Sequence, residues 1–221
     1  MSDVKTAIPP RKDYLSPDSH RRDSLSGVKT AIMDAAERRM QLGGFGGFSF
    51  REIAADVGIK SSSVHYHFPT KEDLAAAVIR RWAEETSKFI DEELEKDPDP
   101  VRVWTNAFRG TALSEGRMCP CTVLGAASQD LPPEVAREVK GFFKMCLDRL
   151  VAEGLSPSSA AEVLSTITGA LVVANALGDT AAYDRATSDL LRQREAARAG
   201  LLSKPRRLGQ RGRAPIRRRS S

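Results

Sequence analysis

The chain has 221 residues, of which 41% are hydrophobic, and it carries a formal net charge of +5 with a pI of about 9.3. This apolar content suffices for the core of one large or two modest domains, which excludes a disordered chain. No run approaches the roughly 20 apolar residues that span a bilayer, and the first residues lack the apolar stretch of an export signal. We therefore expect a cytoplasmic protein without a membrane segment.

Positive charge is concentrated at the C-terminus. Eight of the 34 basic residues and none of the 29 acidic residues follow Leu202, so the remainder of the chain is slightly acidic. Residues 203–221 consist largely of Gly, Pro, Arg and Ser, a composition that cannot bury enough surface to fold alone and predicts a disordered basic tail. Residues 1–23 contain three prolines and charges of both signs, and they predict a disordered arm.

The first expected helix spans residues 24–44, where apolar residues recur at helical spacing and two glycines close the segment. The second begins after Ser49, a good N-cap with Glu52 three positions later, and it ends at Gly58. Both boundaries follow from the helix-capping preferences of these residue types. The sequence therefore predicts a long helix followed by a short one.

The third and fourth helices lie on either side of Pro69. Because proline ends a helix, residues 61–67 have room for only about two helical turns. Thr70 is the expected N-cap of a long helix over residues 71–96, with Asp73 three positions later. Two short helices joined by a tight glycine-containing turn predict a helix-turn-helix, whose second helix enters the major groove of DNA.

The composition of that second helix, "SSSVHYH", suits a DNA groove. Serine hydroxyls fit against base edges and phosphates without steric conflict, while histidine and tyrosine reach farther to donate or accept hydrogen bonds. Val64 and the following Phe68 are the expected core residues, which hold the helix against its neighbours.

The stretch "FSFREIAADVGIKSSSVHYHFPTKEDLAAAV" resembles the DNA-binding region of the TetR family of bacterial transcriptional regulators, and the likeness covers roughly residues 28–82. It implies an all-α fold with a helix-turn-helix domain over residues 24–70. A helical domain over residues 71–202 would follow, beginning with residues 71–96 as a connecting helix. In the family, that second domain binds a small effector and forms the homodimer.

The resemblance also implies which residues contact DNA. They are Ser49, Arg51, Lys60, Ser61, Ser62, Ser63, His65, Tyr66, His67 and Lys71. Lys60 stands where the family often has serine, which favours a phosphate contact over a helix cap. Arg39 stands where the family usually has an apolar residue, which leaves the packing of the first helix open at that point.

A histidine pair and a glycine-rich run do not predict binding sites. His65 and His67 could suggest a metal site, but residues two apart on a helix point to different faces and no third ligand lies nearby, so we expect no metal and no other cofactor. The run "GGFGG" resembles a phosphate-binding loop only superficially, since no Gly-Lys-Ser/Thr follows it. A flexible turn between helices is the preferred interpretation.

After the breaker at residues 97–100, amphipathic patterns predict further helices from Val101, from Pro133 to Gly154, and from Thr180 to Ala199. The most apolar segment, "SPSSAAEVLSTITGALVVANALG", predicts a helix capped by Ser156 or Ser158. The segment "MCPCTVLGAASQ" is small and apolar, and we assign no helix to it.

Apolar and aromatic side chains in this second half predict an effector pocket, with ordinary core as the alternative. The pocket candidates are Trp104, Phe108, Cys119, Cys121, Leu124, Phe142, Phe143 and Met145. A broad apolar face with small residues predicts the dimer interface, again with intramolecular core as the alternative. Its candidates are Ala170, Leu171, Val173, Ala174 and Leu177.

The sequence thus predicts a homodimeric transcriptional regulator and not an enzyme. We expect a repressor that a small-molecule effector releases from a pseudo-palindromic double-stranded DNA operator. Two alternatives stay open. Cys119 and Cys121 could sense oxidants or electrophiles, although buried inert cysteine is commoner. The basic tail could instead bind nucleic acid without sequence preference.

Overall fold

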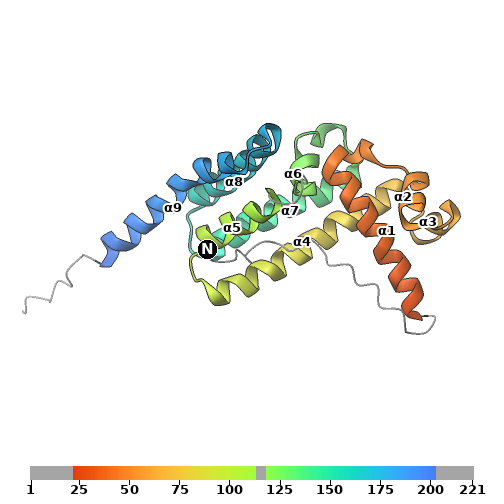
Figure 1. Ribbon diagram of the computed structural model, residues 1–221. Helices are drawn as coiled ribbons and strands as arrows, with labels where there is room; N and C mark the ends of the chain where they lie inside the picture. The colour runs from red at the N-terminus through yellow and green to blue at the C-terminus, as the bar shows by residue number, and fades with distance from the viewer. Residues whose placement is uncertain (1–21, 113–117, 203–221) are drawn as a thin grey trace, which may run out of the picture.

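The computed structural model describes residues 22–112 and 118–202, and these ranges contain helices and no strands (Figure 1). The expected all-α class is confirmed for them, while the N-terminal arm up to residue 21 and the basic tail lie outside the described residues. The helices are α1 (Arg22–Gly43), α2 (Phe50–Val57), α3 (Ser61–His67), α4 (Lys71–Lys96), α5 (Pro100–Ala112), α6 (Pro120–Gly125), α7 (Pro133–Ala152), α8 (Pro157–Leu177) and α9 (Thr180–Leu202), with short 3-10 turns η1 (Phe45–Gly47) and η2 (Ser128–Asp130).

The helix boundaries follow the capping residues of the sequence. The Ser49 hydroxyl accepts a hydrogen bond from the Glu52 amide at the start of α2, and Gly58 ends that helix with a φ of 75°, a conformation that glycine adopts at little cost. Thr70 and Asp73 cap each other at the start of α4, each accepting a hydrogen bond from the other's amide. Ser156 caps α8.

Helix α4 joins the two parts of the molecule. It runs from the end occupied by α2 and α3 toward the opposite end, packing against α1 near its start and against α5 and α7 farther along (Figure 1). Ion pairs reinforce both contacts. Arg81 of α4 binds Asp34 and Glu37 of α1 at 2.8 and 2.7 Å, and Arg80 binds Glu138 of α7 at 2.7 Å. The position of α4 therefore links the α7 side of the molecule to α1.

Helix α6 is the element that the sequence does not predict. Its six residues begin with Pro120 and pack against α1 and α7. Proline is favoured in the first turn of a helix because its missing amide hydrogen has no partner there anyway. The helix is too short to show an apolar period, and only this proline marks its start.

Helix α8 is the one helix among the described residues that is long and apolar enough to span a membrane. An 18-residue window of its 21 residues has a mean hydropathy of 1.5, and this test considers length and composition alone. In the fold it packs against α5, α7 and α9, and Val163, Ile167 and Leu171 are buried among them. Its apolar composition is therefore explained in part by a core-facing side.

Candidate nucleic-acid interface

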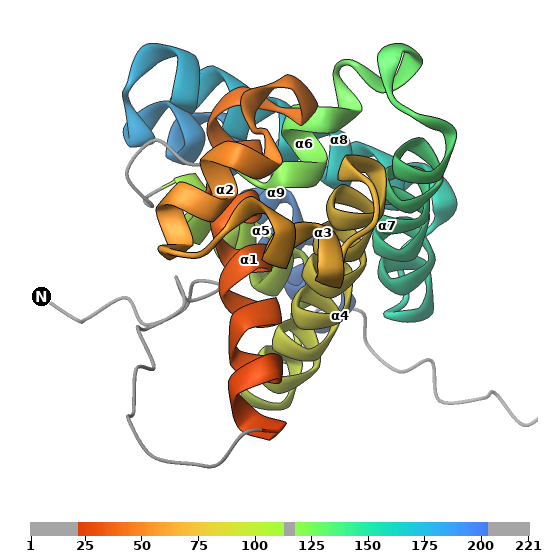
Figure 2. The ribbon, with the colours of Figure 1, turned by 90° about the vertical axis from the view of Figure 1, so that its right-hand side faces the viewer.

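Helix α3 lies at one end of the molecule (Figure 2). Its residues divide into a buried side and an exposed side. Val64 is fully buried and Phe68 is 4% exposed, as the sequence predicts for the residues that anchor the helix. Tyr66, on the other side, is 76% exposed. His65 and Ser62 are also exposed, whereas Ser61, Ser63 and His67 are half-buried. The helix thus offers hydrogen-bonding side chains on a surface held by a firm apolar anchor.

One ring contact joins α3 to α2, and another lies within α3. The His65 ring lies edge-on against Phe50, the first residue of α2, with 4.6 Å between the ring centroids. Tyr66 and His67 make a similar contact at 5.2 Å. His65 therefore packs against α2 while its imidazole stays exposed, so it combines packing with a position from which it can reach a base or phosphate.

Residues that flank α2 and α3 add polar groups to the same end of the molecule. Arg51 and Lys60 are exposed, and Lys60 stands at the N-cap of α3 without making a side-chain cap bond. Ser49 is exposed too, but its hydroxyl is engaged, since it donates to the Glu52 carboxylate at 2.8 Å. Ser49 is thus a cap in this structure, and any contact with a phosphate would have to coexist with that role.

Lys71, at the start of α4, is held between two aromatic rings. Its Nζ lies 4.5 Å from the Phe45 ring centroid and 4.6 Å from that of Phe48, both distances within the range of cation–π attraction. The rings belong to the glycine-rich turn around η1. The "GGFGG" segment is therefore a built platform for this ammonium group, whereas the sequence suggests only a flexible turn.

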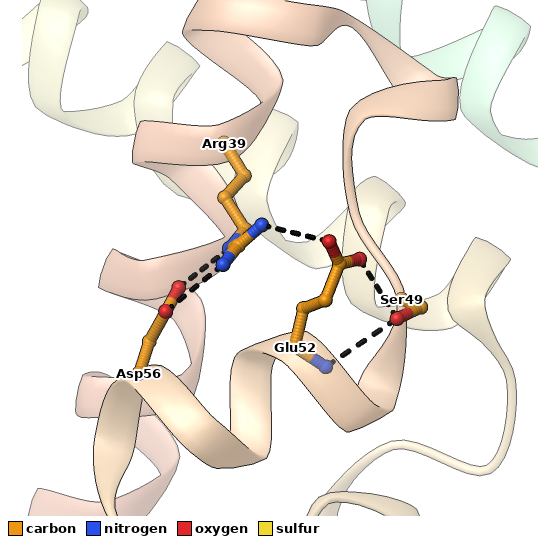
Figure 3. Close-up of polar contacts among 4 residues, drawn as sticks. All are labelled: Arg39, Ser49, Glu52 and Asp56. Carbon is orange, nitrogen blue, oxygen red and sulfur yellow. Dashed lines mark hydrogen bonds and ion pairs between the residues drawn. The ribbon is translucent and has the colours of Figure 1, made fainter.

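Arg39 joins α1 to α2 through two carboxylates (Figure 3). Its Nε and Nη2 donate to the two oxygens of Asp56 at 2.5 and 2.9 Å, and its Nη1 donates to Glu52 at 3.1 Å. The hydrogen bond from Arg39 holds the pKa of Asp56 below its ordinary value. The position where the sequence leaves the packing of the first helix open is therefore filled by an ionic contact.

The predicted effector residues are mostly packed core. Trp104, Phe108, Cys119, Cys121, Leu124 and Phe142 are each at most 2% exposed, and Phe143 and Met145 are half-buried. Trp104 Nε1 donates to Glu153 at 2.9 Å. Three of these residues, Phe108, Cys119 and Phe142, border about 160 Å³ of interstitial space, none of it wide enough for a water molecule.

The same interstitial space is bordered by residues that the sequence did not single out. Trp82 and Thr86 of α4 line it together with Thr111 of α5. Trp82 Nε1 and Thr86 Oγ1 are buried, and neither has a hydrogen-bond partner among the described residues. Their spacing of four residues on the apolar side of a helix, where polar groups are unexpected, is the signal that could have identified them.

All three cysteines are buried and free. Burial raises the pKa of the Cys119 thiol, but hydrogen bonds from Cys121 and Thr122 outweigh that effect and place its pKa below the ordinary value. Burial raises the pKa values of Cys121 and Cys146 well above theirs. Cys119 is therefore the thiol of this group that is easiest to deprotonate.

The predicted dimer residues divide between the core and the surface of α8. Ala170, Leu171 and Ala174 are buried within the chain, whereas Val173 is 50% exposed and Leu177 is 65% exposed. Val172, at 44% exposed, extends this apolar surface. It also borders an open groove of about 350 Å³ between α6, α7 and α8.

Comparisons with known proteins agree with this geometry. Residues 32–78, from α1 into α4, match the model of a family described as bacterial regulatory proteins, tetR family. No curated protein sequence matches the chain. Among solved structures, a transcriptional regulator of the TetR family from Agrobacterium tumefaciens has a TM-score of 0.71 and 27% identity, over 76% of this chain and 98% of that one.

A TetR transcriptional regulator from Legionella pneumophila is similarly close, with a TM-score of 0.70 and 25% identity over 80% of this chain and 99% of that one. A third, from Chloroflexus aurantiacus, has a TM-score of 0.68 and 18% identity over 76% of this chain and 94% of that one, and it supports the fold alone. The similarity therefore extends beyond the helix-turn-helix to the helices that follow it.

Proposed function

Because the chain belongs to the TetR family of bacterial transcriptional regulators, we propose that it is a cytoplasmic, homodimeric repressor that a small-molecule effector releases from a pseudo-palindromic operator. The observation that carries the DNA-binding part is the surface of α3, where Tyr66 is 76% exposed beside the anchored Val64 and Phe68. A large ring on a short helix at the end of a molecule has little to pack against until a groove receives it.

Base selection is assigned to α3 and phosphate contacts to its flanks. Tyr66 and Ser62 are exposed on the helix that enters the groove, and their hydroxyls can bond to base edges. Lys60 and Arg51 lie beside it as exposed cations, which suit phosphates. Lys71 is also assigned to a phosphate, because the rings of Phe45 and Phe48 already hold its ammonium group in position.

Selection of bound duplexes from a random pool tests this assignment. We expect a pseudo-palindrome with half-sites about 34 to 36 Å apart, one turn of the double helix, as a symmetric dimer requires. Tyr66→Ala should select different bases. Lys60→Ala should weaken all duplexes alike and lower the slope of log affinity against log salt by about one unit. Recovery of the wild-type sequence preference with Tyr66→Ala would contradict the role of α3.

The exposed apolar surface of α8 supports the dimer. Val172, Val173 and Leu177 lie on one helix and remain exposed in the single chain, although large apolar side chains gain free energy when they leave water. When a second copy covers these side chains with its own α8, both chains bury the same residues in one contact, as in a two-fold symmetric interface. This surface is distinct from α3, so one chain can bind its partner and DNA together.

Sedimentation of Val173→Glu tests the interface, because the variant places a charge on the exposed surface without disturbing the core. We expect folded monomers. Val151→Glu is the matched control, since Val151 of α7 is also exposed, at 40%, but lies outside α8. A stable Val173→Glu dimer would move the interface elsewhere.

The unpaired donors on α4 support an effector site. A buried donor without a partner costs about 1–3 kcal/mol, and Trp82 and Thr86, whose Nε1 and Oγ1 are such donors, border the same interstitial space. A mostly apolar molecule with a hydrogen-bond acceptor would relieve that cost by entering between α4, α5 and α7. Because α4 also contacts α1, a ligand that shifts α4 would change the arrangement of the DNA-binding helices. Such a ligand binds the shifted arrangement better than the arrangement that fits DNA.

A thermal-shift screen of metabolites, followed by release of a labelled duplex, identifies the effector. Thr86→Val keeps the side-chain shape and removes the hydroxyl, and it should weaken the response by about tenfold, the effect of one lost hydrogen bond in a buried site. Thr168→Val is the control, since the Thr168 hydroxyl already bonds to the Leu164 carbonyl. An effector with equal potency on Thr86→Val and the unmodified chain would place the pocket elsewhere.

Cys119 supports a second candidate, a thiol sensor, through its lowered pKa and its position at the same interstitial space. Replacement of Cys119 and Cys121 with serine separates the two mechanisms. A reversible effector should still release DNA from that variant, whereas release by an oxidant or electrophile should be lost.

A further inference from the structure

The contact between α1 and α2 is unusual in its chemistry. Arg39 uses Nε, Nη1 and Nη2 at once, with Asp56 gripped by two parallel hydrogen bonds and Glu52 held by a third (Figure 3). Glu52 in turn accepts from the Ser49 hydroxyl at 2.8 Å. The bridge therefore runs from the last part of α1 to both the first and the last turn of α2.

Stability alone does not account for such a bridge. The side chains of Arg39, Glu52 and Asp56 are 29%, 49% and 32% exposed, and ion pairs with that much solvent contribute little to folding free energy. A bidentate arginine–carboxylate pair does, however, restrict geometry, because the planar guanidinium fits the carboxylate in one orientation. Its effect is on the angle of α2 more than on the stability of the chain.

The angle of α2 determines where α3 lies. Phe50, the first residue of α2, packs against His65 of α3, and the left-handed turn at Gly58 joins the two helices. α1 is itself anchored to α4 by Arg81. One path from the body of the molecule to the groove-facing helix thus passes through Arg39, beside the chain connection from α3 to α4 and the buried Val64 and Phe68.

The charged residues of α2 also support a role for Arg39 in DNA binding. Glu52 and Asp56 lie on the same short helix as Arg51, a residue assigned to DNA. Without Arg39, the two carboxylates would lose their hydrogen-bonded cation near a phosphate-binding surface, and Asp56 would keep only the charge of Arg38, which makes no salt bridge to it among the described residues. Arg39 supplies the positive charge that neutralises them locally.

We propose that Arg39 is a positioning residue for DNA binding, which holds α2 and therefore α3 in the orientation that fits the groove while its own guanidinium stays on Glu52 and Asp56. It determines affinity without contacting DNA. The role goes beyond the residues assigned to bases and phosphates, and it concerns DNA binding alone, so it stands whether or not an effector or a repressor role is found.

The test uses the full chain and a duplex selected from a random pool with the unmodified protein. Arg39→Ala should lower affinity for that duplex by about tenfold, while base preference and the salt slope stay unchanged. Arg39→Lys, which keeps the charge but cannot grip Asp56 with two bonds, should give an intermediate loss. Arg38→Ala is the matched control, because it removes the same charge from the neighbouring position of α1. Arg38 acts on Asp56 through its charge but makes no salt bridge to it among the described residues.

A charge exchange makes the proposal falsifiable even if Arg39→Ala folds poorly. In the double variant Arg39→Glu, Asp56→Arg, the new arginine can bind residue 39 and also Glu52, four positions earlier on α2. We expect affinity to return to within about threefold of the unmodified chain. A salt slope that falls by about one unit in Arg39→Ala, with no rescue by the exchange, would show a direct phosphate contact and overturn the proposal. Unchanged affinity in Arg39→Ala would overturn it as well.

Discussion

The region of α1 to α3 and the region of α5 to α9 are both helical, but they expose opposite kinds of side chain. The first region exposes rings, hydroxyls and cations on a short helix and fixes them with caps and the Arg39 bridge. The second buries its aromatic residues and exposes an apolar strip on α8. The surface that we propose for DNA, a polyanion of constant shape, is built in advance, whereas the site that we propose for an effector is closed in the core and would have to open.

The largest expected effect is on α8, where Leu171 is fully buried and Val173, two residues later, is half exposed. Leu171→Glu places an unpaired carboxylate in the core, so we expect a loss of at least about 4 kcal/mol of unfolding free energy. Thermal unfolding should show no cooperative transition for this variant. Val173→Glu should remain a folded monomer. At equal protein concentration, it should unfold near the temperature at which the unmodified chain unfolds.

If the two variants unfolded alike, the division of α8 into a core side and an interface side would be wrong. Leu171→Glu therefore reports on folding and cannot by itself report on the dimer. Only the exposed position separates assembly from stability.

This pair also shows what a sequence can and cannot predict here. The starts and ends of α2 and α4 were predictable because Ser49, Gly58 and Thr70 act on their own helix turns. Leu171 and Val173 are both apolar residues of one helix, and which of them faces a neighbour depends on where α5 and α9 pack. That information is tertiary, so the sequence left core and interface open.

The candidate site divides in the same way. α3 and its exposed residues followed from a local motif, but the platform of Phe45 and Phe48 beneath Lys71 joins two elements and was not predicted. The spacing of Trp82 and Thr86 could have placed them on one side of α4, but only the fold shows that their donors are unpaired beside α5 and α7. α6 was missed because six residues are too few for a period.

The second prediction contrasts two rings of the DNA-binding region. Phe68 is 4% exposed and anchors the end of α3, so Phe68→Ala should cost about 3–5 kcal/mol and abolish DNA binding through unfolding of this region. Tyr66→Ala should leave the unfolding free energy unchanged within about 0.5 kcal/mol, because its ring lies in solvent. Urea unfolding with duplex binding on the same samples measures both. A stable Phe68→Ala variant would show that Phe68 does not anchor α3.

The third prediction contrasts two tyrosine hydroxyls across the regions. Tyr183 of α9 is fully buried, and its hydroxyl donates to the Thr105 carbonyl at 2.9 Å, which joins α9 to α5. Tyr183→Phe leaves that carbonyl without its donor and should cost about 1–2 kcal/mol in urea unfolding. Tyr66→Phe should cost nothing measurable but should still alter affinity for a selected duplex. Equal costs for the two substitutions would mean that the phenol of α9 is not a structural contact.

The last and smallest prediction uses the two bidentate arginine pairs, one in each region. Arg109 of α5 binds both oxygens of Asp184 in α9 at 2.5 and 2.9 Å, much as Arg39 binds Asp56. The hydrogen bond from each arginine lowers the pKa of its aspartate below the ordinary value of 3.8. Because the folded pKa is depressed, the stabilisation is present above about pH 4 and is lost as pH falls through the lowered pKa.

Both pairs are partly exposed, so each should contribute less than about 1 kcal/mol. Asp184→Asn and Asp56→Asn should each flatten the decline of unfolding free energy between about pH 4 and pH 2, relative to Asp130→Asn, whose carboxylate makes no salt bridge among the described residues. At neutral pH the two variants should differ. Asp56→Asn weakens duplex binding because its pair orients α2, whereas Asp184→Asn leaves it intact. Weaker binding by Asp184→Asn as well would show that the α5–α9 contact also affects the DNA-binding helices, and that the two regions are less independent than their surfaces indicate.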